Sequence, residues 1–328
     1  MAMIAALCAV IKKDSIFCIH VNHNLRIFEE TKGDAGLVLD FCKKQGINCK
    51  IINIPHGKIE SLAKKKSMGV EAAARFFRRR AFFREAALLG DKTLILTAHT
   101  NDDALELSLM RIIRGAGPVG LAAMPQTRSR FIRPLLSMTR SDVTCYLAAK
   151  NIPWREDSTN TDEKFLRNRV RLRLIPLLNK SFPSWRTGIS VMAETQSLVK
   201  SFIIHEAESR VIWDIVPEKP QIKQGINASF NACAFAGESL KEALSADADN
   251  FFSQMQIVRE ESLYLAIDKL LKGVKNPRSV KRSAVRRFCA GAKAADLGPV
   301  RIRQEGGRIF VFRAEKEFFE CGFSLLIK

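Results

Sequence analysis

The sequence predicts an α/β fold with a doubly wound, mostly parallel sheet, followed by a helical part and a small β-rich segment. Over the first 180 residues, short apolar runs alternate with amphipathic segments, which is typical of parallel strands covered by helices. Residues 186–213 and 237–290 favour helices, with little strand signal. The end of the chain alternates apolar and polar residues around Gly306-Gly307, which predicts a β-hairpin.

The elements of the first part follow from local composition. Apolar residues at helical spacing predict helices over 1–12, 33–45, 71–89, 102–113 and 140–150. Short β-branched or apolar runs predict strands over 15–21, 49–54, 94–97 and 131–136. Within the helix over 71–89, we expect these side chains to face the core: Phe76, Phe77, Phe83 and Leu88.

Three domains are expected: an α/β nucleotide-binding domain over 1–180, a helical domain over 181–295, and a β-rich segment over 296–328. The predicted elements begin with a helix, so the first strand of such a sheet and the turn after it are missing. That strand would belong inside the sheet, so we expect its neighbours to have exposed edges.

Composition indicates the class of partner. Lysine and arginine number 53 against 34 acids, giving a net charge of +19. This excess favours a polyanionic partner, most often nucleic acid, although a generally basic protein without such a partner also fits. No apolar run approaches the ~20 residues of a membrane span. There is also no signal-peptide pattern, so a cytoplasmic protein is expected. The eight cysteines contain no Cys-x-x-Cys pair, which supports neither a zinc nor an iron–sulfur site.

Three acids open the helix after the strand at 94–97: Asp102, Asp103 and Glu106. Carboxylates three and four residues apart share one helix face and attract a divalent cation or an ammonium group. They also complement the helix dipole, with Thr100 or Asn101 as the cap, and both interpretations fit.

Histidines and arginines lie close to the same strand ends. His99 follows one strand, and His20 and His23 end another. Histidines there can contact a phosphate or orient an acid, but a structural role fits equally well. Arginines interleaved with phenylalanines, and a second run over 167–173, suit phosphate contacts. A solvated basic face is the alternative.

Six motifs occur in order: HVNHNLR (20–26), GVEAAARFFRR (69–79), TAHTNDDALEL (97–107), LMRIIRGAGPVGLAAM (109–124), RPLL (133–136) and WREDSTNTDEKFLRNRVRLRLIPLL (154–178). Together they resemble the tRNA(Ile)-lysidine synthetases of the PP-loop ATP pyrophosphatase superfamily, strongly over about residues 1–180. The resemblance implies a PP-loop, Rossmann-like sheet. It also implies a ligase that adenylates the wobble cytidine of the CAU anticodon of isoleucine tRNA with ATP. L-lysine then displaces AMP to form lysidine.

The resemblance also assigns roles to residues. It further implies that Mg²⁺ accompanies ATP and that the protein forms a homodimer. The catalytic candidates are Asp103, Glu106, Asp102 and His99, with Asp102 also a candidate metal ligand. The nucleotide-binding candidates are His20, His23, Arg75 and Gly115. The tRNA-binding candidates are Arg78, Arg79, Arg111, Arg114, Arg167 and Arg171.

The chain departs from the family in one respect. The family's Ser-Gly-Gly-x-Asp-Ser loop, which binds ATP, does not occur in this sequence. A start codon assigned too late explains this best, and a truncated or degenerate gene is the competing explanation. The alternative functions are a non-catalytic tRNA-binding protein and a tRNA thiolase. The lack of paired cysteines counts against the thiolase.

Overall fold

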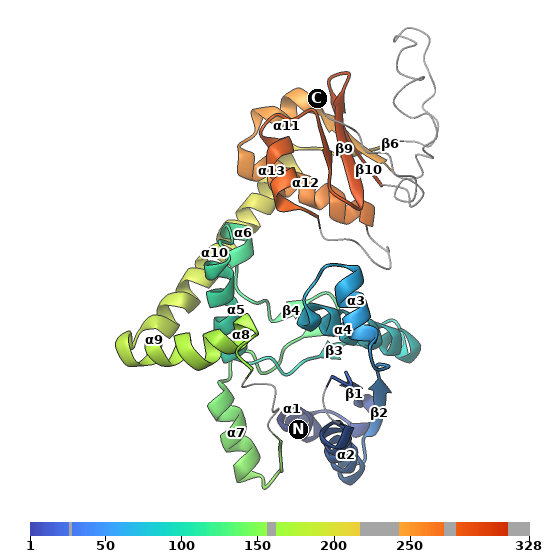
Figure 1. Cartoon of the computed structure of the whole chain (residues 1–328), viewed down its shortest axis with the longest axis vertical. Helices are drawn as coiled ribbons and strands as arrows, with labels where there is room; N and C mark the ends of the chain where they lie inside the picture. Colours follow the sequence, from blue (N-terminus) through green and yellow to red (C-terminus); the bar gives the residue numbers. More distant parts are fainter. Residues whose placement is uncertain (26–27, 156–161, 217–242, 272–279, 314–328) are drawn as a thin grey trace. The chain divides into compact units, whose positions relative to one another are not determined.

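The computed structural model describes residues 1–25, 28–155, 162–216, 243–271 and 280–313 (Figure 1). Its contacts divide the chain into two compact units, Met1–Thr195 and Gln196–Lys328. Parts of the predicted helical and β-rich segments, at 217–242, 272–279 and 314–328, lie outside the described residues.

The first unit alternates strands and helices in the predicted order. Its strands are β1 (Phe17–Asn22), β2 (Asn48–Asn53), β3 (Ile95–Leu96), β4 (Thr127–Arg128) and β5 (Phe131–Ile132). Its helices are α1 (Ala2–Val10), a 3-10 turn (Lys13–Ser15), α2 (Phe28–Gln45), α3 (Lys58–Lys65), α4 (Val70–Leu89), α5 (Asn101–Ile113), α6 (Pro118–Leu121), α7 (Arg140–Ala149), α8 (Leu166–Arg169), a π-helix (Val170–Leu174) and α9 (Ile175–Ser181). Helix α10 (Trp185–Arg210) begins in this unit.

The strands of this unit pair mainly in parallel, which confirms the predicted fold class. β1 pairs with β2 in parallel, with Cys18 opposite Cys49 and His20 opposite Ile51. β3 pairs with β5 in parallel, and β4 adds an antiparallel edge to β5. Within the described residues these are two separate sheets, one of two strands and one of three.

Helix α4 packs with its alanine side inward, which corrects the predicted inward orientation of Leu88, whereas Phe77 packs against a buried apolar cluster as predicted. Its buried residues include Ala73, Ala74 and Ala81, whereas Leu88 is 74% exposed. Small side chains let the helix backbone come close to its neighbours, so alanines can take the buried face. Phe83 is also partly exposed, and its ring packs edge-on against Phe131 of β5.

Helix α5 is held in place by a cluster of buried apolar residues. Leu105 and Leu109 are buried together with Val170 of the π-helix and Trp185 at the start of α10. This cluster joins α5 to the segment that carries the arginine run over 167–173. A π-turn within a helix often marks a functional position, and here it lies directly beside the acids of α5.

The second unit has one five-stranded sheet, in the order β6-β7-β10-β9-β8, and all its pairings are antiparallel. Its elements are β6 (Asp214–Val216), β7 (Ala243–Asp247), α11 (Ala248–Ser253), α12 (Gln256–Leu271), α13 (Arg282–Cys289), β8 (Ala294–Asp296), β9 (Val300–Glu305) and β10 (Arg308–Arg313). The predicted hairpin around Gly306-Gly307 is the β9–β10 pair. Phe251, Phe288 and Leu263 lie in the core between the sheet and its helices.

This unit differs from the predicted division into a helical domain and a β segment. Residues 243–247, expected within a helix, form β7, which pairs with β10 and with β6. A short apolar run does not distinguish a buried strand from a helix by its periodicity. Pairing with β10, a strand some sixty residues later, makes residues 243–247 a strand. The β-hairpin is therefore part of one sheet with β6 and β7 rather than an appendage.

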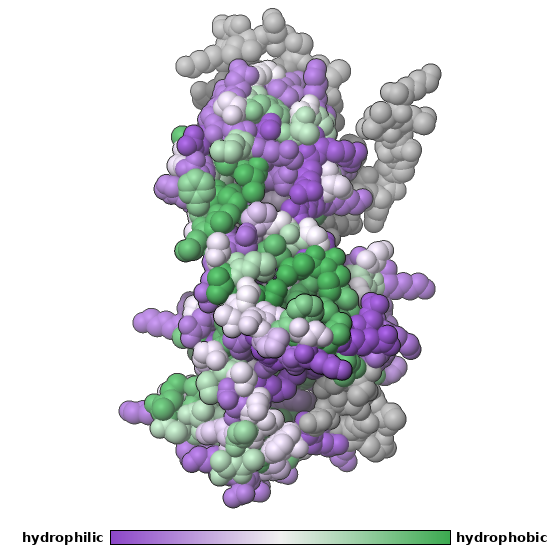
Figure 2. Space-filling model, turned by 90° about the vertical axis from the view of Figure 1, so that its left-hand side faces the viewer, coloured by the Kyte–Doolittle hydropathy of each residue, from purple (hydrophilic) through white to green (hydrophobic). Residues whose placement is uncertain are grey.

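Among the described residues, no helix is both long enough and apolar enough to cross a membrane. On the face shown in Figure 2, apolar residues form patches bordered by hydrophilic ones.

Candidate functional site

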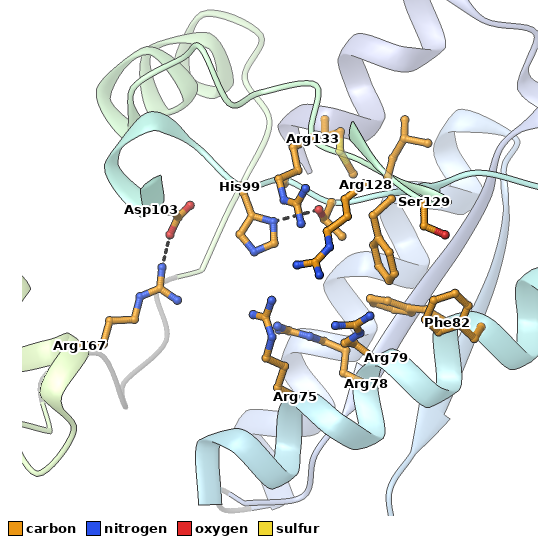
Figure 3. Close-up of a pocket in the computed structure, with 16 residues that line it drawn as sticks. Arg75, Arg78, Arg79, Phe82, His99, Asp103, Arg128, Ser129, Arg133 and Arg167 are labelled. Carbon is orange, nitrogen blue, oxygen red and sulfur yellow. Dashed lines mark hydrogen bonds and ion pairs between the residues drawn. The ribbon is translucent and has the colours of Figure 1, made fainter. Parts of the chain in front are cut away.

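A cavity of about 530 Å³ opens beside the carboxyl end of β3 (Figure 3). Such a volume is in the range of small-molecule sites. Its lining contains six arginines and one carboxylate, Asp103. The arginines are Arg75, Arg78, Arg79, Arg128, Arg133 and Arg167.

The arginines come from opposite walls. Arg75, Arg78 and Arg79 lie three and four residues apart on α4, so they share one face of that helix. In Figure 3 they point towards Arg128 and Arg133, which come from β4 and from the residue after β5. These side chains converge on one space, so a bound anion would be surrounded by guanidinium groups.

Burial and the crowding of positive charges in the cavity lower the pKa of individual arginines. Burial and the charges of Arg75 and Arg167 lower the pKa of Arg78. Burial and three neighbouring arginines lower the pKa of Arg133. Arginine stays protonated in proteins, so this repulsion persists until an anion enters. Arg79 is held in part by aromatic rings, with its guanidinium carbon 5.4 Å from the centroid of Phe131.

His99 lies in the same cavity as a neutral imidazole. Its Nδ1 is 2.9 Å from the hydroxyl of Thr97. Burial, opposed by Asp103 and reinforced by Arg133, Arg75 and Arg78, lowers the pKa of His99 to about 4. At neutral pH this side chain can therefore donate or accept one hydrogen bond without adding positive charge.

Asp103 has two roles at the start of α5. Its Oδ2 accepts hydrogen bonds from the Thr100 backbone N–H at 2.8 Å and from the Thr100 hydroxyl at 3.1 Å. This completes a capping box and fixes the first turn of the helix. Its other oxygen accepts from Arg167 across the cavity. The helix-cap and cation-binding interpretations of this acid therefore both apply, with arginine as the cation.

Glu106 is buried and fully engaged. Only 1% of its surface is exposed. Arg167 Nε donates to one oxygen at 2.7 Å, and Arg171 Nε donates to the other at 2.7 Å. A second nitrogen of Arg171 lies 3.0 Å from Glu106 Oε2. Glu106 thus anchors Arg167 and Arg171, two of the six predicted tRNA-binding arginines, and is not open to a small ligand in this arrangement.

Asp102 does not line this cavity. Its Oδ2 accepts from the Arg140 backbone N–H at 2.7 Å, and its Oδ1 accepts from Arg186 at 2.9 Å. Burial would raise the pKa of Asp102, but these hydrogen bonds and charges lower it overall. Both oxygens already have donors, so the residues present do not fit a Mg²⁺ site at this carboxylate.

Three predicted residues lie at the carboxyl end of α5, and none of them lines the arginine-rich cavity. Arg111 donates to the carbonyl of Ala122 at 2.8 Å and so holds the loop after the helix. Arg114 is exposed and ends the helix. Gly115 has φ +67°, a left-handed conformation that suits glycine after a helix. These positions have structural roles that sequence motifs do not distinguish from contacts with a nucleotide or tRNA.

His20 lines another cavity, of about 400 Å³, together with Asp34, Thr100 and Trp154. It lies at the carboxyl end of β1, and His23 follows the same strand as a half-buried side chain. His20 and His99 therefore line different cavities, and Ala98, at the strand end beside His99, lines both.

Four further arginines near the site were not selected from the sequence: Arg128, Arg133, Arg140 and Arg186. Arg133 belongs to the RPLL motif, which could have identified it. Arg186 contacts Asp102 across 84 residues of sequence, and no local pattern indicates such a contact.

A family model described as the PP-loop domain matches residues 1–178. The chain belongs to this family. The resemblance to PP-loop enzymes that the six motifs predicted is therefore confirmed.

Curated proteins similar to this chain include tRNA(Ile)-lysidine synthases. One from Treponema denticola is 41% identical over 207 residues, which is 62% of this chain and 44% of the relative. Another, from Deinococcus radiodurans, is 34% identical over 175 residues, which is 53% and 28% of the two chains. The chain spans less than half the length of these relatives.

Among solved structures, a U34-tRNA thiolase, NcsA from Methanococcus maripaludis with its [4Fe-4S] cluster, has a TM-score of 0.47 and 17% identity. The match covers 61% of this chain and 68% of that one. This likeness is too distant to support a function.

Proposed function

We propose that the chain takes part in the ATP-dependent ligation of lysine to the wobble cytidine of isoleucine tRNA with a CAU anticodon, forming lysidine through an adenylated base. The observation that carries this proposal is the arginine-lined cavity directly beside Asp103. Its support is the similarity of residues 1–178 to the PP-loop domain and of about 60% of the chain to lysidine synthases.

The cavity would hold a phosphate-rich ligand. Six guanidinium groups against one carboxylate favour ATP phosphates or the tRNA backbone. Neutral His99 would contribute a hydrogen bond to that ligand without adding charge. The basic composition of the whole chain supports a tRNA partner.

Asp103 is the acid we propose to receive the lysine ammonium, because it lines the cavity and Glu106 does not. An incoming ammonium would replace Arg167 at the Asp103 oxygen that faces the cavity. Asp103 would also accept a proton from the ammonium, because the amine must be neutral before its nitrogen attacks the ring carbon whose oxygen carries AMP, and AMP then leaves. Glu106 would act as a positioning residue for Arg167 and Arg171.

The test is lysine incorporation. The purified chain is incubated with labelled lysine and a transcript of the CAU isoleucine tRNA, with and without ATP. Incorporation that requires ATP supports the proposal. A transcript with a GAU anticodon is the control and should receive no label.

Asp103→Asn keeps the shape and a capping oxygen but removes the charge. We expect transfer to fall at least about tenfold, ~1.4 kcal/mol in the barrier, while tRNA binding measured by filter retention stays close to wild type. Unchanged transfer would contradict the assignment of Asp103. If the chain binds the tRNA but incorporates no lysine in any condition, it is a tRNA-binding protein without catalysis.

A further inference from the structure

Three cysteines far apart in the sequence meet in the first unit. Cys18 lies on β1, Cys49 on β2 and Cys42 in the last turns of α2. Their Sγ atoms all lie within 4.8 Å of one another. Among the described residues, this is the group of side chains that comes close enough to share a metal ion.

The strand register explains this meeting. Cys18 and Cys49 are direct partners in the parallel β1–β2 pair, so their side chains lie on the same face of the sheet. Helix α2 connects the two strands and packs against both of them. Cys42 is fully buried on the helix, where it meets the pair. The convergence is therefore fixed by backbone pairing and by a buried helix residue.

The spacing is suitable for one thiolate-bound metal ion. With metal–sulfur bonds of ~2.3 Å, two sulfurs on one ion are ~3.8 Å apart in tetrahedral and ~4.0 Å apart in trigonal geometry. The observed upper limit of 4.8 Å exceeds these two separations by about 1.0 and 0.8 Å, a difference that small rotations about the Cα–Cβ bonds can close. Thiolates select soft ions such as Cu(I) and Zn(II) over Mg²⁺.

Without a metal, Cys18 and Cys49 are neutral thiols. Burial, followed by the proximity of Cys42, raises the pKa of Cys49 to about 11. Burial also raises the pKa of Cys18. Each thiol that binds an ion therefore loses its proton to solvent, and the cation replaces the protons as the balancing charge.

We propose that Cys18, Cys42 and Cys49 form a binding site for one soft, thiophilic metal ion that ties α2 to the β1–β2 pair. The site is separate from the arginine-lined cavity, since none of the three cysteines lines it. Cys18 lies two residues before His20, which lines the smaller cavity. A bound ion therefore restrains the strand that carries this histidine.

The test uses Cd(II) as the probe, with the full chain reduced and then freed of reductant. We expect about one Cd(II) per chain to remain after desalting against glutathione, with an ultraviolet sulfur-to-cadmium charge-transfer band. Cd(II) should also raise the thermal midpoint, because an ion that binds the folded state stabilises it. A chain that retains no Cd(II) against glutathione overturns the proposal.

Cys42→Ser should abolish both the retained Cd(II) and the thermal shift. Since Cys42 is fully buried, the half-buried Cys49→Ser is the second variant, and circular dichroism checks that each is folded. Cys145→Ser is the matched control, because Cys145 is an exposed free thiol on α7. If Cys145→Ser lowers the retained Cd(II) as much as a folded Cys49→Ser does, the ion binds scattered thiols and no cysteine site exists.

Discussion

The pairing of Glu106 with Arg167 and Arg171 makes a quantitative prediction for Glu106→Gln. This change keeps the size of the side chain and removes its charge. The amide oxygen can still accept from one arginine, but the amide nitrogen then faces the donors of the other. Two guanidinium groups, whose side chains are 32% and 21% exposed, lose the charge of Glu106, although Arg167 keeps its ion pair with Asp103.

The expected cost follows from burial. Removing one partner of a buried ion pair costs about 3–5 kcal/mol. The carboxylate is buried, but water reaches part of each arginine and solvates it after the change, so we expect about 2–4 kcal/mol. Glu163→Gln is the matched control, because Glu163 pairs with Arg173 where both side chains are exposed. An exposed pair of this kind contributes about 0–1 kcal/mol.

Trp185 provides the assay, because it is buried in the same apolar cluster as Leu105 and Leu109. Urea unfolding is followed by its fluorescence in a background where Trp154 and Trp213 are replaced by phenylalanine. The free energy of unfolding should fall far more for Glu106→Gln than for Glu163→Gln. If the two variants agree within about 0.5 kcal/mol, the error expected for exposed sites, the ion-pair argument is wrong.

Three further predictions concern the cavity, His99 and a helix cap. Arg78→Ala should weaken tRNA binding and reduce the salt slope of log K by about one. Arg80 is exposed on the same helix outside the cavity, so Arg80→Ala should change tRNA binding and its salt slope less. Equal effects of the two substitutions would count against the cavity as the phosphate site. For His99, the folded pKa of about 4 lies below the unfolded value of 6.5, so only the unfolded chain gains a proton as the pH falls between these values. The free energy of unfolding of the wild type should therefore drop across this window relative to that of His99→Gln. Urea unfolding of both proteins is measured from pH 7 to pH 4, and the same pH dependence in both would disprove the lowered pKa of His99. Thr139 caps α7 by accepting from the Asp142 N–H at 3.1 Å, so Thr139→Ala should cost about 1 kcal/mol in urea unfolding. Ser141→Ala, at an exposed position in the first turn of the same helix, should cost less.

Local patterns in the sequence determined the order of elements in the first unit. The strands at β1 and β2, the long helices α4 and α5 and the β9–β10 hairpin all lie within a few residues of their predicted positions. Short-range physics sets these features: apolar periodicity, glycine turns and a threonine–aspartate capping box. The motifs also indicated the PP-loop family, which the family model confirms.

Only the tertiary structure decided which groups meet. Glu106 and Arg171 are 65 residues apart, and no local pattern pairs them. The spacing of Cys18, Cys42 and Cys49 resembles no metal motif, yet parallel register and one helix bring them together. Residues 243–247 form a strand because β6 and β10 pair with them. Contacts between distant residues depend on how whole elements pack, and a sequence read along its length contains this information only indirectly.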